Sequence, residues 1–378
     1  MYYGNSIFMP FHFLNNIKAI HIFSFFNSQY MNCLFLLLFF IGQYSGLMGT
    51  GSLPVIIEGQ QPNLSIDNSG IIRMVYGNQD KIYCITSSDN GINFSTPALV
   101  AELPKMHLGS SRGPQIASSS TRSLISAIDK NGNIHSYILN HLKGIWTKVA
   151  NVSDSQGSAV EGLMSLASDK NDNFYATWLD IRDGGNNNIY FSSLNSKSRK
   201  WSPNTLVYKS PDKHVCECCK PNIVANNGKV VIGFRNWLMG ARDIYYAVST
   251  NKGKSFIAPV KSGNGSWQLN ACPMDGGSLA LLASGKVSAA WRRNGDVYYW
   301  TEKQAEQKLA PGRDVSMAQN KNSVYVAWHD NKKIQVMNLN TKQITEIGTG
   351  TSPKIYVLDN EKAICLWEDN KSVRFKII

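Results

Sequence analysis

The sequence predicts an all-β protein that forms one seven-bladed β-propeller, with six blades as the alternative. Three observations lead to this prediction. A strand–turn–strand pattern recurs along the chain, its copies lie about 37 to 55 residues apart, and each follows a short apolar strand. Repeats of this length are typical of propeller blades. A chain of 378 residues has room for two domains, but the repeat has no gap, so we expect one.

The repeating unit is a strand with an aromatic or apolar end, then a polar turn, then a returning strand that starts with Ile or Val. The returning strands are predicted to begin at Ile82, Ile134, Ile189, Ile244, Val297, Ile334 and Val373. We interpret each copy as the two middle strands of a blade. A short apolar strand such as "PNLSID" or "PKIYVL" precedes it, and an outer strand such as "PALVAEL" follows most copies.

The two ends of the repeat complement each other. The seventh copy reaches Ile378 without a fourth strand, whereas "LPVIIEG" at 53–59 has no blade of its own. An unpaired sheet edge is an aggregation hazard that propellers avoid by closing the ring. We therefore predict that this N-terminal strand completes the last blade.

The first 50 residues differ in composition from the rest. The apolar run "CLFLLLFFIG" (33–42) has the length of a signal-peptide core and is short for a membrane span. We expect a signal region at 1–50, with Met31 as an alternative start, and a propeller at 51–378 that is secreted or periplasmic. An uncleaved signal anchor is the alternative, and it would be the only membrane association.

The chain is basic, with a formal net charge of +12. A basic surface favours anionic partners. No block of consecutive basic residues occurs, so nucleic acid is not expected as a partner. We expect a monomer whose partner is an anionic glycan or another acidic ligand.

Two segments share a longer hairpin signature, S-x-D/N-x-G-x-x-F: "SSDNGINF" (87–94) and "STNKGKSF" (249–256). We expect the Asp or Asn to bond the turn backbone, the Gly to adopt a positive φ, and the Phe to pack beneath the turn. These segments resemble the Asp-box, or bacterial neuraminidase repeat. With "CECCKP" and "ACPMDG", the chain resembles the sialidase superfamily, in particular a bacterial sialidase-like subgroup. The resemblance implies a propeller whose ligand face lies away from the boxes.

If the chain is an enzyme, the resemblance implies a glycoside hydrolase of the exo-α-sialidase type. The family's Arg-Ile-Pro motif and its Tyr/Glu pair are not found at matching positions, so no catalytic residue is carried over and the question of enzymatic activity stays open. Acid/base work on a glycosidic bond needs a pair of nearby carboxylates. The candidates are Asp183, Asp243, Asp275 and Glu161.

One face of the predicted ring gathers polar residues. The turns between second and third strands share this face with the connections that enter each first strand, and a concave face of this kind is the usual ligand site. Its candidate ligand-binding residues are Arg112, Arg182, Arg235, Arg242, Arg292 and Arg313, with Trp267 for stacking on a sugar ring. Guanidinium groups suit carboxylate or sulfate. Ion pairs between blades are the alternative role for these arginines.

Four cysteines are predicted on the same face. In "HVCECCKP" (214–221), Cys216, Cys218 and Cys219 enter one blade, and Cys272 enters the next. Three interpretations stay open: disulfides that staple adjacent connections, a copper or zinc site, or a redox-active thiol. The candidate further metal ligands are His107, His214 and Met274.

Three functions follow from these features. The first is an exported sialidase-like propeller that binds an anionic glycan through its arginine-rich face and, in an extended form of the hypothesis, hydrolyses it. The second is a metal or redox propeller centred on the cysteines. The third is a non-catalytic interaction scaffold with disulfide-stapled loops.

Overall fold

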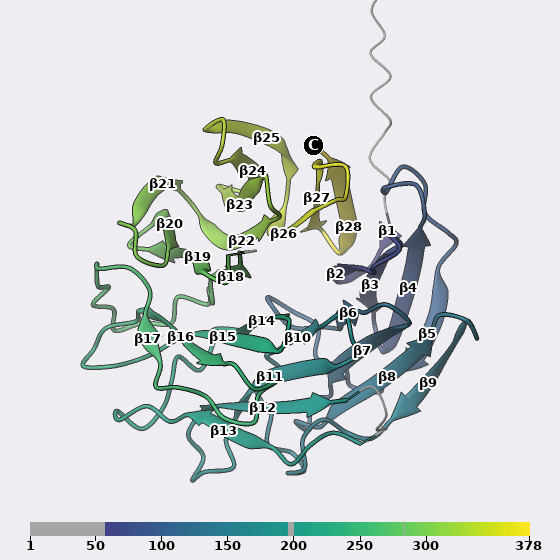
Figure 1. The fold of residues 1–378 in the computed structure, drawn as a ribbon, viewed down its shortest axis with the longest axis horizontal. Coiled ribbons are helices and arrows are strands. Elements are labelled where there is room, and N and C mark those ends of the chain that lie inside the picture. The colour runs from purple at the N-terminus through teal and green to yellow at the C-terminus, as the bar shows by residue number, and fades with distance from the viewer. Residues whose placement is uncertain (1–56, 196–199, 283) are drawn as a thin grey trace, which may run out of the picture. The chain divides into compact units, whose positions relative to one another are not determined.

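Seven four-stranded antiparallel sheets stand around a common centre (Figure 1). They are seen in a computed structural model that describes residues 57–195, 200–282 and 284–378. The predicted all-β, seven-bladed propeller is therefore confirmed over these residues, and six blades are excluded. The described residues contain no helix, and so no helix among them is able to span a membrane. The expected signal region at 1–50 lies outside the described residues.

The first three blades take up the N-terminal half of the ring. Blade 1 consists of β2 (Gln60–Ile66), β3 (Ile72–Asn78), β4 (Lys81–Ser87) and β5 (Ala98–Glu102). Blade 2 consists of β6 (Gln115–Ser118), β7 (Arg122–Ile128), β8 (Ile134–Asn140) and β9 (Ile145–Val149). Blade 3 consists of β10 (Met164–Ser168), β11 (Phe174–Asp180), β12 (Asn188–Leu194) and β13 (Thr205–Tyr208).

The next three blades continue the same order, from the innermost strand to the outermost. Blade 4 consists of β14 (Asn222–Asn226), β15 (Lys229–Arg235), β16 (Ile244–Ser249) and β17 (Val260–Lys261). Blade 5 consists of β18 (Ser278–Leu281), β19 (Val287–Arg293), β20 (Asp296–Thr301) and β21 (Gln307–Pro311). Blade 6 consists of β22 (Arg313–Gln319), β23 (Val324–Asp330), β24 (Lys333–Asn338) and β25 (Gln343–Thr349).

Blade 7 joins the two ends of the described chain, as predicted. It consists of β26 (Thr351–Val357), β27 (Ala363–Asp369), β28 (Ser372–Ile377) and, as its outermost strand, β1 (Ile57–Glu58). Ile57 pairs with Val373, and the Gly59 N–H donates to the Lys371 carbonyl at 2.9 Å. This pairing closes the ring and leaves β28 with a partner on both sides.

The returning strands β4, β8, β12, β16, β20, β24 and β28 begin within one residue of their predicted starts. Local signals suffice for this, because the apolar alternation and the turn residues are both contained in each short segment. The burial of strands then falls from the middle of a blade outward. Every residue of β11 is buried, whereas most of β9 is exposed.

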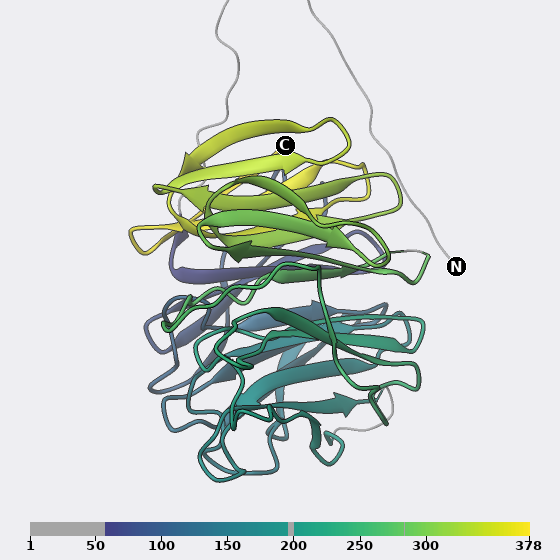
Figure 2. The ribbon, with the colours of Figure 1, turned by 90° about the vertical axis from the view of Figure 1, so that its left-hand side faces the viewer.

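The core is divided among the junctions between blades. A hydrophobic cluster lies at each junction, including the one between blades 7 and 1. There Leu64 and Met74 of blade 1 pack with Leu366 and Phe375 of blade 7. Each sheet is thus covered on both faces by its neighbours, which explains the continuous apolar second strands. Figure 2 shows the same ring after a quarter turn.

Both S-x-D/N-x-G-x-x-F segments form the predicted turns. At the first, Asp89 accepts a hydrogen bond from the Asn93 N–H at 2.9 Å, and Gly91 has a φ of 83°. At the second, the Ser249 hydroxyl donates to Asn251 at 2.8 Å. These turns join the third and fourth strands, so they lie on the face opposite to the connections that enter the blades.

Candidate functional site

A central cavity of about 250 Å³ runs between the innermost strands. Each blade contributes to its wall, for example through Asn63, Gln115, Ser165, Asn222, Ser278, Ser316 and Lys354. The connections that enter the blades line its mouth with Ser111, Lys220 and Met274, and Ser352 near the start of β26 adds to the lining. The cavity therefore opens on the face where the sequence predicted a ligand.

Two lysines share this cavity, Lys220 at the entry of blade 4 and Lys354 in β26 of blade 7. Both line its wall, the charge of Lys354 acts on the Lys220 amine, and Lys220 Nζ donates to Gln115 Oε1 at 3.1 Å. Burial lowers the pKa of both amines, and at Lys220 the neighbouring Lys354 charge lowers the pKa further. In the described part of the chain neither amine has a carboxylate within 4.0 Å.

Two carboxylates lie beside the lysines. Asp275 accepts the Asp314 N–H at 2.8 Å, and burial raises the pKa of the Asp275 carboxyl although the Arg235 charge opposes this. The Asp314 carboxylate contacts His329 Nε2 at 3.1 Å. Burial raises the pKa of Asp314, but the hydrogen bond and charge of His329 outweigh it and the pKa is lowered. The pKa values of the two carboxyl groups are thus shifted in opposite directions.

Four of the six candidate arginines are engaged inside the protein. Arg235 is 1% exposed and donates to the carbonyls of Asp275, Arg242 and Arg292. Arg112 donates to the Glu161 carbonyl at 2.6 Å. The guanidinium groups of Arg182 and Arg242 are likewise held, by Asp180 and by Cys216 with the Leu269 carbonyl. These contacts give the four arginines structural roles.

Arg292 and Arg313 remain available on the same face. Burial, followed by the charge of Arg313, lowers the pKa of Arg292. Arg313 is exposed and lies 3.7 Å from an Asp314 carboxylate oxygen. Trp267 is only 8% exposed, because the guanidinium groups of Arg235 and Arg292 both lie 5.5 Å from its ring. Its ring is therefore occupied by cations and is not an open platform for a sugar.

The other candidate carboxylates are bonded to neighbours on the rim. Asp183 accepts the Tyr190 hydroxyl at 2.7 Å. Asp243 accepts the Trp267 N–H at 2.9 Å and pairs with Lys261 at 2.7 Å. Glu161 lies 3.5 Å from Arg112. Of the four candidate carboxylates, Asp275 is the one that lines the central cavity together with Lys220 and Lys354.

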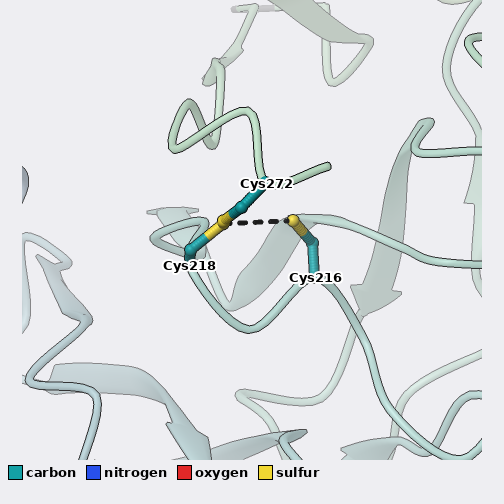
Figure 3. Close-up of side chains that lie close together, drawn as sticks. All are labelled: Cys216, Cys218 and Cys272. Atoms are coloured by element: carbon teal, nitrogen blue, oxygen red, sulfur yellow. Dashed lines mark hydrogen bonds between the residues drawn. A yellow bond between two sulfur atoms is a disulfide. The ribbon is translucent and has the colours of Figure 1, made fainter. Parts of the chain in front are cut away.

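The four candidate cysteines come together in one cluster, and Figure 3 shows three of them, Cys216, Cys218 and Cys272. A disulfide joins Cys218 to Cys272, with their Cα atoms 6.4 Å apart, and so it links the connections that enter blades 4 and 5. Cys216 and Cys219 are free thiols with their sulfurs 2.9 Å apart. The Cys216 sulfur is 3.8 Å from that of Cys218. One staple and one thiol pair thus share a single site.

Cationic groups surround the buried thiol pair. Arg242 Nη1 donates to the Cys216 sulfur at 3.1 Å. The hydrogen bond between Cys216 and Cys219 is the main cause that lowers the pKa of Cys216 to about 7, with further lowering by Arg235 and Arg242 against the effect of burial. Burial raises the pKa of Cys219. The pair therefore favours one thiolate and one thiol.

Of the three candidate further metal ligands, His107, His214 and Met274, the two histidines are not part of the sulfur cluster. Among the described residues, the His, Cys, Asp and Glu groups close enough to share a metal are Cys216, Cys218 and Cys272, and neither His107 nor His214 joins them. A Cβ added at Gly162 would overlap the His107 ring, and His214 stacks edge-on against Trp237 with ring centroids 4.5 Å apart. Met274 lines the cavity mouth.

Sequence reasoning missed Lys220 and Lys354 as site residues. One signal was present, since Lys354 interrupts the apolar innermost strand "PKIYVL". A charged residue in such a strand either reaches the surface or faces the channel. The meeting of the two lysines has no local signal, because they belong to blades that are not adjacent in the sequence.

The structure defines the protein as a seven-bladed β-propeller, and it is similar in fold to several solved structures. U3-55K superposes with a TM-score of 0.51 at 12% identity, covering 86% of this chain and 98% of that chain. The β-propeller domain of the Trilobed protease from Pyrococcus furiosus gives a TM-score of 0.50 at 9% identity, covering 85% and 95%. NanB with Optactamide gives 0.42 at 13% identity, covering 89% and 72%.

At these identities the similarities show the fold alone. No protein family matches the chain. No curated protein matches it either. The resemblance to the sialidase superfamily, and with it the assignment of the two turns as Asp-boxes, therefore stays a prediction.

Proposed function

We propose that this protein binds an anionic ligand, specifically the acidic end of a glycan, in the central cavity of its propeller. The observation that supports the proposal best is that Lys220 and Lys354 both line that cavity, where the charge of Lys354 acts on the Lys220 amine. Like charges that meet in a low-dielectric site repel each other and are costly to bury. An anion placed between the two amines removes this repulsion and accepts hydrogen bonds from both.

The size and the surroundings of the cavity suit such a ligand. Its volume of about 250 Å³ is near the lower end of the range for small-molecule pockets. Gln115, Asn63 and Asn222 add neutral polar groups to the wall, which suits the hydroxyl groups of a sugar. Arg292 and Arg313 add positive charge on the same face. The proposal is limited to binding, because three of the four candidate carboxylates already bond to rim residues.

The test is calorimetric titration of the full-length protein with N-acetylneuraminate, glucuronate and the neutral sugar glucose. We expect the two acids to bind and glucose to bind far more weakly. Replacing Lys354 by Met removes one charged hydrogen bond, which is about 1.5 to 3 kcal/mol. The affinity for the acids should therefore fall by roughly ten-fold to one hundred-fold.

The matched control is Lys286→Met, which removes an exposed lysine far from the cavity lining and should leave the affinity unchanged. Thermal unfolding of each variant checks that the fold is retained. Equal binding of acids and glucose, or an unchanged affinity in a folded Lys354→Met variant, would contradict the proposal.

A further inference from the structure

The four-cysteine site is built from two separate connections, and this gives it a defined shape. Cys216 is fixed by its N–H, which donates to the Arg235 carbonyl at 3.0 Å, and the Cys219 N–H donates back to the Cys216 carbonyl at 3.3 Å. A tight turn therefore presents three sulfurs from one connection. Cys272 approaches them from the connection that enters blade 5 (Figure 3).

Two of the sulfur spacings match a tetrahedral thiolate site, whereas the 2.9 Å between the Cys216 and Cys219 sulfurs has to widen when a metal binds. Zinc–sulfur bonds of about 2.3 Å in a tetrahedron place the sulfurs about 3.8 Å apart. The Cys216–Cys218 and Cys218–Cys219 sulfurs are 3.8 Å and 3.9 Å apart. The ligand atoms of Cys216, Cys218 and Cys272 all lie within 4.8 Å of one another. A disulfide staple requires only two cysteines, and it does not account for the free thiols of Cys216 and Cys219 beside it.

The surroundings of the sulfurs suit several thiolates at one point. Cys216 and Cys219 are fully buried, Cys218 is half-buried and Cys272 is exposed, so one side of the site is open for metal entry. Arg242 donates to the Cys216 sulfur at 3.1 Å, and it stacks over Trp237 at 4.6 Å, which holds it in place. Fixed cations next to the sulfurs offset the negative charge that bound thiolates retain.

We propose that Cys216, Cys218, Cys219 and Cys272 bind one thiophilic d10 cation, Zn²⁺ or Cu⁺, in the form of the protein in which the Cys218–Cys272 bond is reduced. Thiolates are soft ligands and select these two cations. A dithiol reductant supplies the two electrons and two protons that convert the disulfide into two thiols, and it becomes a disulfide itself. The ligand thiols then release their protons to water as the metal binds. This proposal does not rest on the proposed binding of an anion in the central cavity.

The experiment uses the full chain, reduced with dithiothreitol and separated from it under nitrogen. Zn²⁺ and Cu⁺ are added in separate titrations, with a chelator of known affinity as the competitor. Co²⁺ serves as a spectroscopic probe, because thiolate ligands give it a charge-transfer absorption band. We expect one cation per chain, and the competition identifies which of the two is held more tightly.

Variants locate the cation. Cys272→Ser alters an exposed side chain, so the fold should persist, and the affinity should fall by more than about 100-fold. Arg242→Gln removes a hydrogen bond to a ligand and should weaken binding by roughly ten-fold. Cys84→Ala removes a thiol from the core between blades 1 and 2 and should leave both the affinity and the Co²⁺ band unchanged.

Three results would overturn the proposal. The first is a folded, reduced chain that retains no metal. The second is binding of equal strength in wild type and Cys272→Ser. The third is a Cys218–Cys272 bond that resists the dithiol as long as the chain stays folded, which would leave the cluster as a staple only.

Discussion

Asp180 and Arg182 fix blade 3 to the connection that enters it. Both Asp180 carboxylate oxygens accept hydrogen bonds, from Arg182, Ser158 and the Trp178 indole. Arg182 continues the network to Asp154 at 2.6 Å. Burial raises the pKa of Asp180, but these hydrogen bonds outweigh it and the pKa is lowered. An arginine that the sequence suggested for ligand binding is thus part of the scaffold.

Replacing Asp180 by Ala removes the carboxylate that accepts two hydrogen bonds from the Arg182 guanidinium group, and the positive charge of Arg182 loses its main partner. We expect the free energy of unfolding to fall by about 3 kcal/mol at neutral pH. Since the folded-state pKa is below the ordinary value, the stabilisation is present above about pH 4 and is lost as the pH falls through the folded-state pKa. Urea unfolding of wild type and variant at several pH values should show the difference shrink in acid.

Asp330→Ala is the matched control for Asp180→Ala. Asp330 ends the second strand of blade 6 as Asp180 ends that of blade 3, but its carboxylate accepts a hydrogen bond from the side chain of the neighbouring Asn331 at 3.1 Å. Its replacement should have little effect on stability. A large loss in Asp330→Ala, or a pH-independent loss in Asp180→Ala, would contradict this account.

The turn between the third and fourth strands of blade 4 depends on two of its residues, Gly253 and Phe256. Gly253 has a φ of 84°, and a Cβ at this position would overlap the Phe191 ring of the neighbouring blade. Phe256, three residues later, packs edge-on against the same ring with centroids 5.2 Å apart. The turn of blade 4 is therefore also part of the junction with blade 3.

Gly253→Ala should cost more than its backbone conformation alone explains. A positive φ costs a non-glycine residue about 1 kcal/mol, and overlap with Phe191 adds about 1 to 3 kcal/mol. Gly285→Ala is the control, since its φ is 79° and nothing lies within 4 Å of the added Cβ. Urea unfolding should show a larger fall in the free energy of unfolding for Gly253→Ala than for Gly285→Ala. An equal fall in both would show that the Phe191 ring moves aside without destabilising the fold.

Closure of the ring is a property of the whole molecule. β1 provides the outermost strand of blade 7 through pairing with β28, and Glu368 of β27 accepts hydrogen bonds from the Gln61 N–H at 3.0 Å and side chain at 2.9 Å. The two ends of the described part of the chain, which are far apart in sequence, are thereby joined by backbone and side-chain bonds.

A chain that begins at Gly59 lacks β1 and so should lose the pairing with β28. The comparison is with a chain that begins at Gly51. We expect the melting temperature of the shorter chain to fall by a few degrees. The exposed edge of β28 should also promote self-association, which light scattering detects. Identical melting and a monomeric state in both chains would show that β1 does not stabilise the ring.

The sequence alone determined the fold, the strand positions, the closing strand and the two glycine turns. These features depend on local alternation, turn chemistry and a count of strands, all of which are contained in short segments. It also placed Cys216, Cys218, Cys219 and Cys272 on one face, because propeller connectivity assigns every connection to a face.

Only the tertiary structure decided what the charged groups do. Arg235 and Arg242 look like ligand residues in sequence, yet their donors are taken by carbonyls and a sulfur. Lys220 belongs to "CECCKP" but was not singled out as a site residue, and Lys354 lies in an apolar strand, yet the closed ring places both in the lining of one cavity. The physical reason is that hydrogen bonds and charge interactions act over a few ångströms in space. Their partners come from blades distant in sequence, so no local pattern records them.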